Sequence, residues 1–249
     1  MFIAANWKMN LDKSSIEGFC NLIQNYEFNK QINTCIFPPN VYISYLKKII
    51  KKLPISIGGQ CCHYKTKGAF TGEVSPSSLK DIGCDYVILG HSERRTHNNE
   101  SNSYVQKCAT SAINSNLIPI ICVGETLENR EEGSALEFIS KQINESLPKY
   151  FDNIIIAYEP IWSIGTGKIP TNFEIREMHN HIKDLISLKF NKFIKVLYGG
   201  SVNSSNVSDI LLVDNVDGFL IGGASLNPKD FLAIYSSTVK HLDKSSFKY

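Results

Sequence analysis

The sequence predicts an α/β protein, a single-domain (β/α)8 barrel that occupies residues 1–249. Eight short apolar, β-branched runs begin near Phe2, Ile32, Ser56, Tyr86, Ile118, Ile154, Lys195 and Gly218. Their mean spacing is about 31 residues, the size of one strand–helix unit. No linker, low-complexity stretch or change in composition divides the chain, so eight units use its full length.

Three of the predicted strands are apolar at every position rather than at alternate positions. They cover residues 87–89, 154–157 and 218–221. Continuous apolar runs are typical of strands buried on both faces, as in parallel sheets. A doubly wound parallel sheet is the alternative architecture, but such sheets usually contain fewer strands.

Helix signals lie between the strands. Ser14, followed three residues later by Glu17, matches a capping box and predicts a helix start. A Lys-rich helix is expected over residues 41–52. Proline in a first turn predicts helices that begin at Pro76 and Pro228. Apolar residues at i, i+3 and i+4 predict helices over 134–147 and 171–187. We expect the polar tail, residues 243–249, to be frayed.

Composition and charge exclude several classes of protein. The 43% hydrophobic content provides a large core and argues against disorder. The net charge of +2 provides no basic stripe, so we expect no nucleic-acid partner. No apolar run approaches the ~20 residues of a membrane helix, and the start lacks a signal-peptide pattern. These features predict a cytoplasmic protein without a membrane partner.

The cysteines do not indicate a metal site. The chain has seven, with no C-x-x-C spacing, and reduced thiols acting as small hydrophobic groups explain them. Cys61, Cys62 and His63 are adjacent, but no second ligand pair has zinc spacing. We therefore expect neither a metal nor a cofactor.

Candidate catalytic residues directly follow the predicted strands, because catalytic groups of such barrels lie at the carboxyl ends of strands. Asn6 and Lys8 follow the first strand, His91 follows the fourth and Glu159 follows the sixth. A carboxylate at a dry rim can act as a general base. A helix start after His91 would keep the imidazole neutral. The alternatives are a structural ion pair for Glu159, a core histidine and a solvated lysine.

Glycine pairs after the last two strands indicate a phosphate site. Gly199 and Gly200 precede Ser201, and Gly222 and Gly223 follow the eighth strand. Glycine leaves backbone N–H groups accessible at a helix start, which suits an anion. The alternative is that these glycines only turn the chain. The run at 165–168 fits neither a Walker loop nor a dinucleotide fingerprint.

Eight motifs along the whole chain resemble, in the same order, those of the triosephosphate isomerase family. They are ANWKMN (5–10), GAFTGE (68–73), GHSERR (90–95), CVGET (122–126), AYEPIW (157–162), IGTGK (164–168), YGGSV (198–202) and DGFL (217–220). The resemblance implies a TIM barrel that interconverts dihydroxyacetone phosphate and D-glyceraldehyde 3-phosphate. It also implies a cytoplasmic homodimer without cofactor, acting in glycolysis and gluconeogenesis.

The resemblance also implies the roles of individual residues. Glu159 would be the base and neutral His91 the electrophile, which is the pairing known for this family. Lys8 would stabilise the enediolate, and Asn6 would hold a substrate oxygen. Asn6, Lys8, Gly165, Ser201, Gly222 and Gly223 would bind the substrate and its phosphate, and Ser92, Glu93, Cys122 and Leu220 would support the site. The lid would comprise Pro160, Ile161, Trp162, Ser163, Ile164, Gly165, Thr166, Gly167 and Lys168. Phe70 and Thr71 would lie on the dimer arm.

Several positions depart from the family pattern. Cys61 replaces a common Asn, Ser163 replaces a common Ala, and Lys183 replaces an Arg as the expected partner of Asp217. The stretch 96–103 lacks the usual Gly-Glu and Asp pattern apart from Glu100. Two other functions stay open on the sequence alone: another phosphate-binding barrel enzyme, such as an aldolase, and an inactive binding protein. A Schiff-base aldolase would require a late buried lysine, whereas Glu159 ends the sixth strand.

Overall fold

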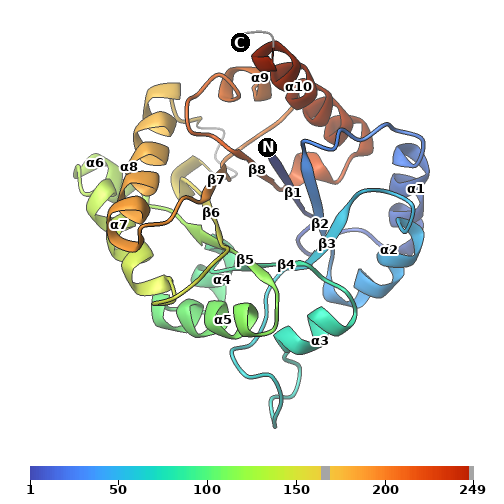
Figure 1. The fold of residues 1–249 in the computed structure, drawn as a ribbon, viewed down its shortest axis with the longest axis horizontal. Coiled ribbons are helices and arrows are strands. Elements are labelled where there is room, and N and C mark those ends of the chain that lie inside the picture. The colour runs from blue at the N-terminus through green and yellow to red at the C-terminus, as the bar shows by residue number, and fades with distance from the viewer. Residues whose placement is uncertain (164–168, 247–249) are drawn as a thin grey trace.

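The computed structural model, which describes residues 1–163 and 169–246, is a closed barrel of eight parallel strands in chain order, surrounded by helices (Figure 1). The predicted fold class is therefore confirmed. The strands are β1 (Phe2–Asn6), β2 (Asn33–Phe37), β3 (Ser56–Gly59), β4 (Tyr86–Leu89), β5 (Ile118–Val123), β6 (Ile155–Tyr158), β7 (Lys195–Tyr198) and β8 (Gly218–Ile221).

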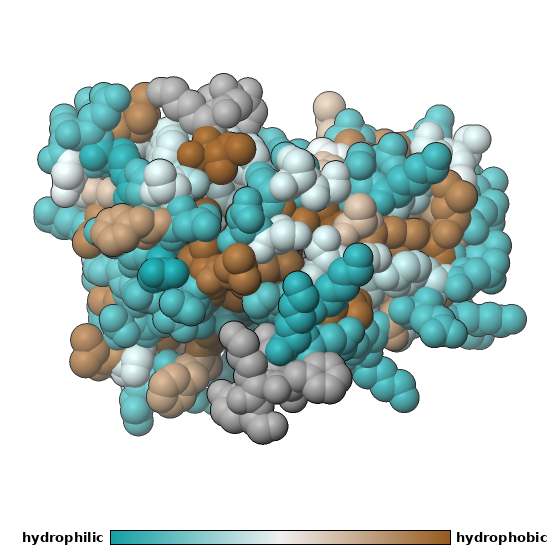
Figure 2. All heavy atoms as spheres, turned by 90° about the horizontal axis from the view of Figure 1, so that it is seen from above, coloured by the Kyte–Doolittle hydropathy of each residue, from teal (hydrophilic) through white to brown (hydrophobic). Residues whose placement is uncertain are grey.

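The helices form the outer ring. They are α1 (Lys13–Ile23), α2 (Ile43–Ile49), α3 (Pro76–Asp81), α4 (Ser92–His97), α5 (Asn102–Asn114), α6 (Leu127–Glu131), α7 (Ala135–Ser146), α8 (Asn172–Phe190), α9 (Val207–Ile210) and α10 (Pro228–Ser246), with 3-10 turns η1 (Asn40–Tyr42), η2 (Ile161–Ser163) and η3 (Gly223–Ser225). The outer face over α9 and α10 is mostly hydrophilic, with smaller hydrophobic patches (Figure 2). Helices that bury one side against a barrel have this character.

One prediction about a helix start was wrong. Helix α1 is capped by Asp12, whose carboxylate accepts the Ser15 N–H at 2.9 Å, so the predicted cap at Ser14 is already helical. An aspartate cap satisfies an orphan N–H of the first turn as well as serine does. Helix α10 extends to Ser246, and residues 247–249 of the tail expected to fray lie outside the described residues.

Alternate strand residues point to two different apolar layers. Phe2 and Ala4 face the barrel interior, whereas Ile3 and Ala5 face the helices. Both layers are buried, which explains the continuously apolar strands. The barrel closes where Phe2 pairs with Gly218, and a Cβ at Gly218 would lie 1.8 Å from the Phe2 carbonyl oxygen. Glycine at this position allows β8 to approach β1.

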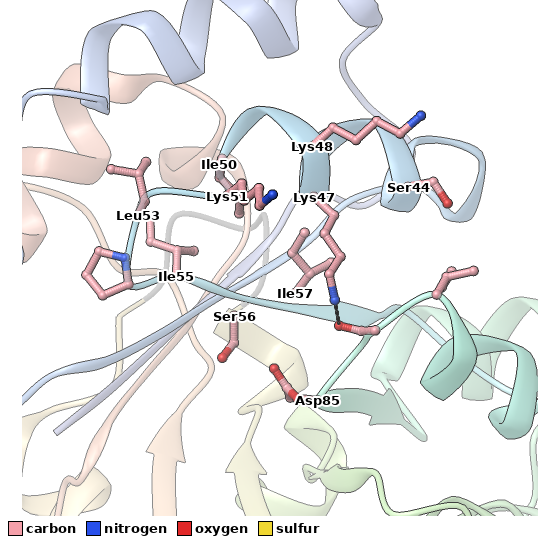
Figure 3. Close-up of a pocket in the computed structure, with 13 residues that line it drawn as sticks. Ser44, Lys47, Lys48, Ile50, Lys51, Leu53, Ile55, Ser56, Ile57 and Asp85 are labelled. Atoms are coloured by element: carbon pink, nitrogen blue, oxygen red, sulfur yellow. Dashed lines mark hydrogen bonds between the residues drawn. The ribbon is translucent and has the colours of Figure 1, made fainter.

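A hollow of about 610 Å³ lies between α2 and the segments that precede β3 and β4. Its floor includes Ile50, Ile55 and Ile57. Lys47 extends from α2, and its ammonium donates to the carbonyl oxygen of Gly83 at 2.8 Å (Figure 3). This hollow is at the amino ends of the strands, whereas the predicted site residues follow their carboxyl ends. Within the described ranges, no helix combines the length and apolar character that crossing a membrane requires.

His179, on α8, is completely buried against the barrel. Its ring lies between Tyr158 and Tyr198, with centroid distances of 5.9 and 6.5 Å, and its Nδ1 is 3.1 Å from the carbonyl oxygen of Asn215. Burial lowers the pKa of His179 to about 4, because a charged imidazole would lose its hydration there.

We expect the buried His179 to make stability depend on pH. The unfolded histidine titrates near pH 6.5, so acid stabilises the unfolded chain while native His179 stays neutral. The contribution of neutral His179 to the free energy of unfolding is complete above pH 6.5 and is lost as the pH falls towards 4. Between pH 7 and 5 the free energy of unfolding should fall by about 2 kcal/mol from this group.

Urea unfolding at both pH values tests this expectation. His179→Gln should remove that part of the pH dependence, whereas His181→Gln, a change two residues further along α8, should retain it. Equal pH dependence in the wild type and His179→Gln would contradict the assignment.

Candidate active site

A cavity of about 360 Å³ opens at the carboxyl ends of the strands. It is lined by residues that follow β1, β4, β6, β7 and β8, together with Leu220 of β8: Asn6, Lys8, His91, Glu159, Gly199, Gly200, Ser201, Val202, Asn203, Leu220, Gly222, Gly223 and Ala224. Of the residues expected to be catalytic or to bind phosphate, the structure brings together all except Gly165, which lies outside the described residues.

Glu159 and His91 are in direct contact within this cavity. Glu159 is 2% exposed, and its Oε1 lies 3.1 Å from Nε2 of His91. The other carboxylate oxygen accepts the Ser92 backbone N–H at 2.9 Å. The predicted supporting residue Ser92 therefore contacts the carboxylate through its main chain.

The protonation of His91 follows from its other nitrogen. His91 is the N-cap of α4, and its Nδ1 accepts the Glu93 N–H at 3.2 Å. A nitrogen that accepts must carry a lone pair, so in the neutral ring the proton is on Nε2. In this tautomer His91 directs an N–H towards Glu159.

Lys8 has a left-handed backbone conformation, with φ 52°, which is costly for a residue other than glycine. The Asn6 side chain accepts the Lys8 N–H at 3.0 Å, and the Gln60 side chain donates to the Lys8 carbonyl at 2.7 Å. These bonds maintain the conformation and direct the ammonium into the site. The sequence analysis missed Gln60, although it directly follows β3.

The Lys8 ammonium is 2.6 Å from Oε1 of Glu93. Partial burial alone would raise the pKa of Glu93, but the hydrogen bond from Lys8, together with nearby positive charge, outweighs it and lowers the pKa. Glu93 therefore stays a carboxylate that orients Lys8 without being buried itself.

The residues predicted to bind phosphate lie at the β7 and β8 ends of the cavity. Gly222 lies beside Lys8, since a Cβ at Gly222 would be 3.2 Å from the Lys8 Cε. Gly223 begins η3, and the Ser201 hydroxyl donates to the Ser163 carbonyl at 3.1 Å. The first lid residues, 160–163, are described, and Ser163 is buried. Ile164, Gly165, Thr166, Gly167 and Lys168 lie outside the described residues.

A buried carboxylate, Glu125, contacts the start of the predicted lid. In the sequence it belongs to the CVGET motif and was not a candidate site residue. Glu125 is fully buried, and its Oε1 accepts from the Trp162 indole at 2.8 Å and from the Tyr158 hydroxyl at 2.9 Å. The Arg130 guanidinium lies over the Trp162 ring, 5.9 Å from its centroid. Burial, and then the Glu125 charge, raise the pKa of Tyr158, so its hydroxyl stays a donor. Glu125 thus joins β6 to the lid.

Cys122, on β5, is fully buried in the barrel interior. Burial, and then the Glu159 charge, raise the pKa of its thiol well above the usual range. The thiol is therefore protonated and packs as an apolar group beside Glu159. Among residues 1–163 and 169–246, no group of three His, Cys, Asp or Glu side chains could hold a metal ion.

Comparison with known proteins agrees with this geometry. A family model described as triosephosphate isomerase matches residues 1–238. The chain belongs to the triosephosphate isomerase family. The triosephosphate isomerase of Dictyoglomus thermophilum is 42% identical over 247 residues, which cover 94% of this chain and 98% of that protein. That of Alkaliphilus oremlandii is 40% identical over 240 residues, covering 93% and 97%.

A solved structure shows the same fold. The crystal structure of triosephosphate isomerase from Bartonella henselae matches with a TM-score of 0.87 and 38% identity, covering 95% of this chain and 98% of that one. One departure from the family pattern has a clear structural outcome. The Lys183 ammonium is 2.8 Å from Oδ2 of Asp217, so the predicted pairing is confirmed with a single contact. Cys61, another of the replacements, is only partly buried, and burial raises the pKa of its thiol.

We expect Gly199→Ala to disturb the carboxylate. A Cβ at this position would lie 2.9 Å from Glu159 Cγ and 3.1 Å from the Tyr158 carbonyl oxygen. Overpacking of this kind should lower the free energy of unfolding by about 1–3 kcal/mol. Gly18→Ala is the control, since no atom lies within 4 Å of a Cβ there and α1 should gain up to ~1 kcal/mol. Urea unfolding compares the two, and equal stability would contradict the predicted clash.

Proposed function

We propose that the chain catalyses the interconversion of dihydroxyacetone phosphate and D-glyceraldehyde 3-phosphate. Membership of the triosephosphate isomerase family supports this proposal. The observation that carries it is the 3.1 Å contact between Glu159 and His91 in a cavity that also contains Asn6 and Lys8. These four side chains provide a base, a hydrogen-bond donor, an amide and a cation.

The reaction moves one proton between adjacent carbons. Glu159 removes a proton from C1 of dihydroxyacetone phosphate, and the electron pair moves onto the carbonyl oxygen to form an enediolate. The Nε2–H of His91 polarises that oxygen and transfers protons between the two oxygens. Glu159 then returns its proton to C2. Substrate between the two residues replaces the His91–Glu159 contact, so the base is released from the group that holds it.

The phosphate of the substrate is held at the β7 and β8 ends. Backbone amides of Gly222 and Gly223, with Ser201, surround it, and Lys8 supplies the positive charge. The further amide that the resemblance implies, that of Gly165, lies outside the described residues. Asn6 holds a substrate oxygen. Proton transfer alone requires no metal or cofactor.

The resemblance implies a lid from Pro160 to Lys168 that closes over the substrate, and residues 160–163 of it are described. An enediolate phosphate exposed to water can eliminate its phosphate, so closure protects the intermediate and fixes its geometry, as is known for this family. The Trp162–Glu125 and Ser201–Ser163 hydrogen bonds hold the described start of the lid in this structure.

The rival functions differ in a measurable way. Another phosphate-binding barrel enzyme would process a different sugar phosphate, and an inactive binding protein would process none. A coupled assay of the purified protein with each triose phosphate separates these alternatives. The Glu159 carboxylate at the end of β6 argues against a Schiff-base aldolase, which requires a lysine nucleophile.

The proposed reaction belongs to glycolysis and gluconeogenesis, and we place the protein in the cytoplasm on that basis. Seven cysteines without disulfides among the described residues agree with a reducing compartment. Fractionation of the source cells, with the isomerase activity followed in each fraction, tests the location.

We expect Glu159→Gln to abolish isomerisation while leaving phosphate binding intact. The amide keeps the shape of the side chain but cannot accept the proton, and loss of a general base costs about 10²–10⁴-fold in rate. Steady-state kinetics measures kcat, and isothermal titration calorimetry with inorganic phosphate measures binding independently of turnover. Glu137→Gln, an exposed change on α7, is the control. Near-native turnover in Glu159→Gln would exclude this base.

We also propose that the chain is a homodimer whose arm includes Phe70 and Thr71. The segment between β3 and α3 projects away from the barrel (Figure 1). Met9, Val41 and Phe70 are exposed apolar residues that follow β1, β2 and β3, three neighbouring strands of the barrel. Exposed apolar side chains grouped on one rim indicate a protein interface.

Sedimentation velocity tests the assembly. The wild type should sediment as a dimer, and Phe70→Asp should shift it towards monomer because the charge would be buried against the partner. Phe173→Asp, at another exposed apolar position, on α8, should leave the dimer unchanged. A monomeric wild type at micromolar concentration would rule the dimer out.

A further inference from the structure

We propose that Arg95 is a positioning residue that sets the orientation of His91. Arg95 is on α4, one turn after His91, and its backbone N–H donates to the His91 carbonyl at 3.0 Å. Its side chain turns back, and Nε donates to the Gly90 carbonyl at 2.7 Å. The inference rests on the proposed function of His91.

These two bonds fix both peptide groups that flank His91. The Gly90 carbonyl belongs to the peptide that enters His91, and the His91 carbonyl belongs to the peptide that leaves it. Together they determine the direction of the Cα–Cβ bond and therefore where the imidazole points. The Nδ1 contact with Glu93 N–H then selects the rotation of the ring.

The other end of the guanidinium reaches the neighbouring elements. Nη2 donates to the Cys122 carbonyl of β5 at 3.2 Å and is 3.3 Å from the Ser146 hydroxyl of α7. Nη1 donates to the Asn102 side chain at 2.6 Å. One planar group thus fixes the carboxyl end of β4 relative to β5. Strand β5 lies between β4 and β6, and Glu159 directly follows β6.

All these acceptors are uncharged. Asn102 lies in the stretch that lacks the family's usual Asp pattern, and its amide donates onward to Glu145 Oε2 at 2.8 Å. Burial lowers the pKa of the Arg95 guanidinium, since no carboxylate accepts directly from it among its contacts in the described residues. The residue is therefore placed to organise carbonyl groups rather than to form an ion pair.

Glycine at position 90 is required by the same contact. Gly90 has φ +65°, and a Cβ there would lie 2.8 Å from Nη2 of Arg95 and 2.9 Å from Val105 Cγ2. A lysine at 95 could not reproduce the arrangement, because an ammonium lacks the planar fork that reaches Gly90, Cys122 and Asn102 together. The conservative substitution therefore isolates geometry from charge.

Arg95→Lys should lower kcat by about 10–100-fold, because small misplacements of a catalytic group have effects of this size. KM should change by less than about threefold, because the residues proposed to bind the phosphate follow β7 and β8, away from Arg95. Arg176→Lys, at an arginine on α8 that pairs with Asp214, is the matched control. The ¹H–¹⁵N spectrum of histidine-labelled protein should show an altered His91 Nε2 signal in Arg95→Lys only.

A crevice of about 740 Å³ makes chemical rescue feasible. It is lined by Arg95 together with Asn102, Gln142 and Glu145, so it would admit a small cation to the space that Arg95→Ala leaves. Added guanidinium should restore kcat in Arg95→Ala with saturation, and ammonium at equal ionic strength should not. A change that merely weakened folding would not be rescued in this way, because guanidinium also denatures.

The outcomes separate the inference from the proposed function. A wild type without isomerase activity would refute the proposed function, and the His91 spectrum of Arg95→Lys would still test the positioning. An active wild type with unchanged kcat and unchanged His91 signals in Arg95→Lys would overturn the inference. If Arg95→Ala fails to fold, Arg95→Lys decides the question by the same two measurements, and Asn102→Ala, which removes the Nη1 acceptor together with the Glu145 and Ser146 hydrogen bonds, supports it.

Discussion

The contact between His91 Nε2 and the Glu159 carboxylate depends on the closed barrel. The two residues follow β4 and β6, and β5 lies between those strands. Closure brings all eight carboxyl ends to one rim, so side chains far apart in the chain converge without a dedicated domain. A one-residue shift of a strand relative to the next would move every side chain on it to the opposite face, and the side chains of the two buried layers would no longer fit together. The packing of the barrel therefore determines the geometry of the site.

Main-chain groups provide much of the precision within the site. The Ser92 N–H holds Glu159, the Glu93 N–H sets the His91 tautomer, and side chains hold the strained backbone of Lys8. A backbone group has fewer soft torsions than a side chain, so it orients its partner at a lower entropic cost. The strained φ of Lys8 persists because Asn6 and Gln60 bond to both of its peptide groups. The site is therefore orientated before any substrate arrives.

The sequence predicted the barrel well because the repeat length and the continuously apolar strands are consequences of the fold itself. It also predicted that Asn6, Lys8, His91 and Glu159 lie together, because each is at or directly after the end of a recognisable strand, and the structure has all four in one cavity. Long-range contacts could not be found in the same way. The Gln60 amide donates to the carbonyl oxygens of Phe37 and Lys8. Glu125 accepts hydrogen bonds from Trp162 and Tyr158, which lie at or after the end of the next strand. Asp12 took the cap expected at Ser14 because either residue can fill that role.

The uneven use of arginine follows the same geometric requirement. The chain has four arginines among 26 basic residues, so lysine is its default cation. Lys183 makes a single contact with Asp217 where a point charge is sufficient. Three of the four arginines instead contact several groups or donate through a defined N–H. Arg94 bonds to Glu100 through Nε, and Arg95 bonds to two strand ends. Arg130 lies near Glu125, Glu174 and the Trp162 ring. Exposed Arg176, which pairs only with Asp214 among its contacts in the described residues, is the exception. Where a planar, forked donor is needed to hold backbone in place, lysine cannot replace it, and a lysine-rich composition leaves arginine at those positions.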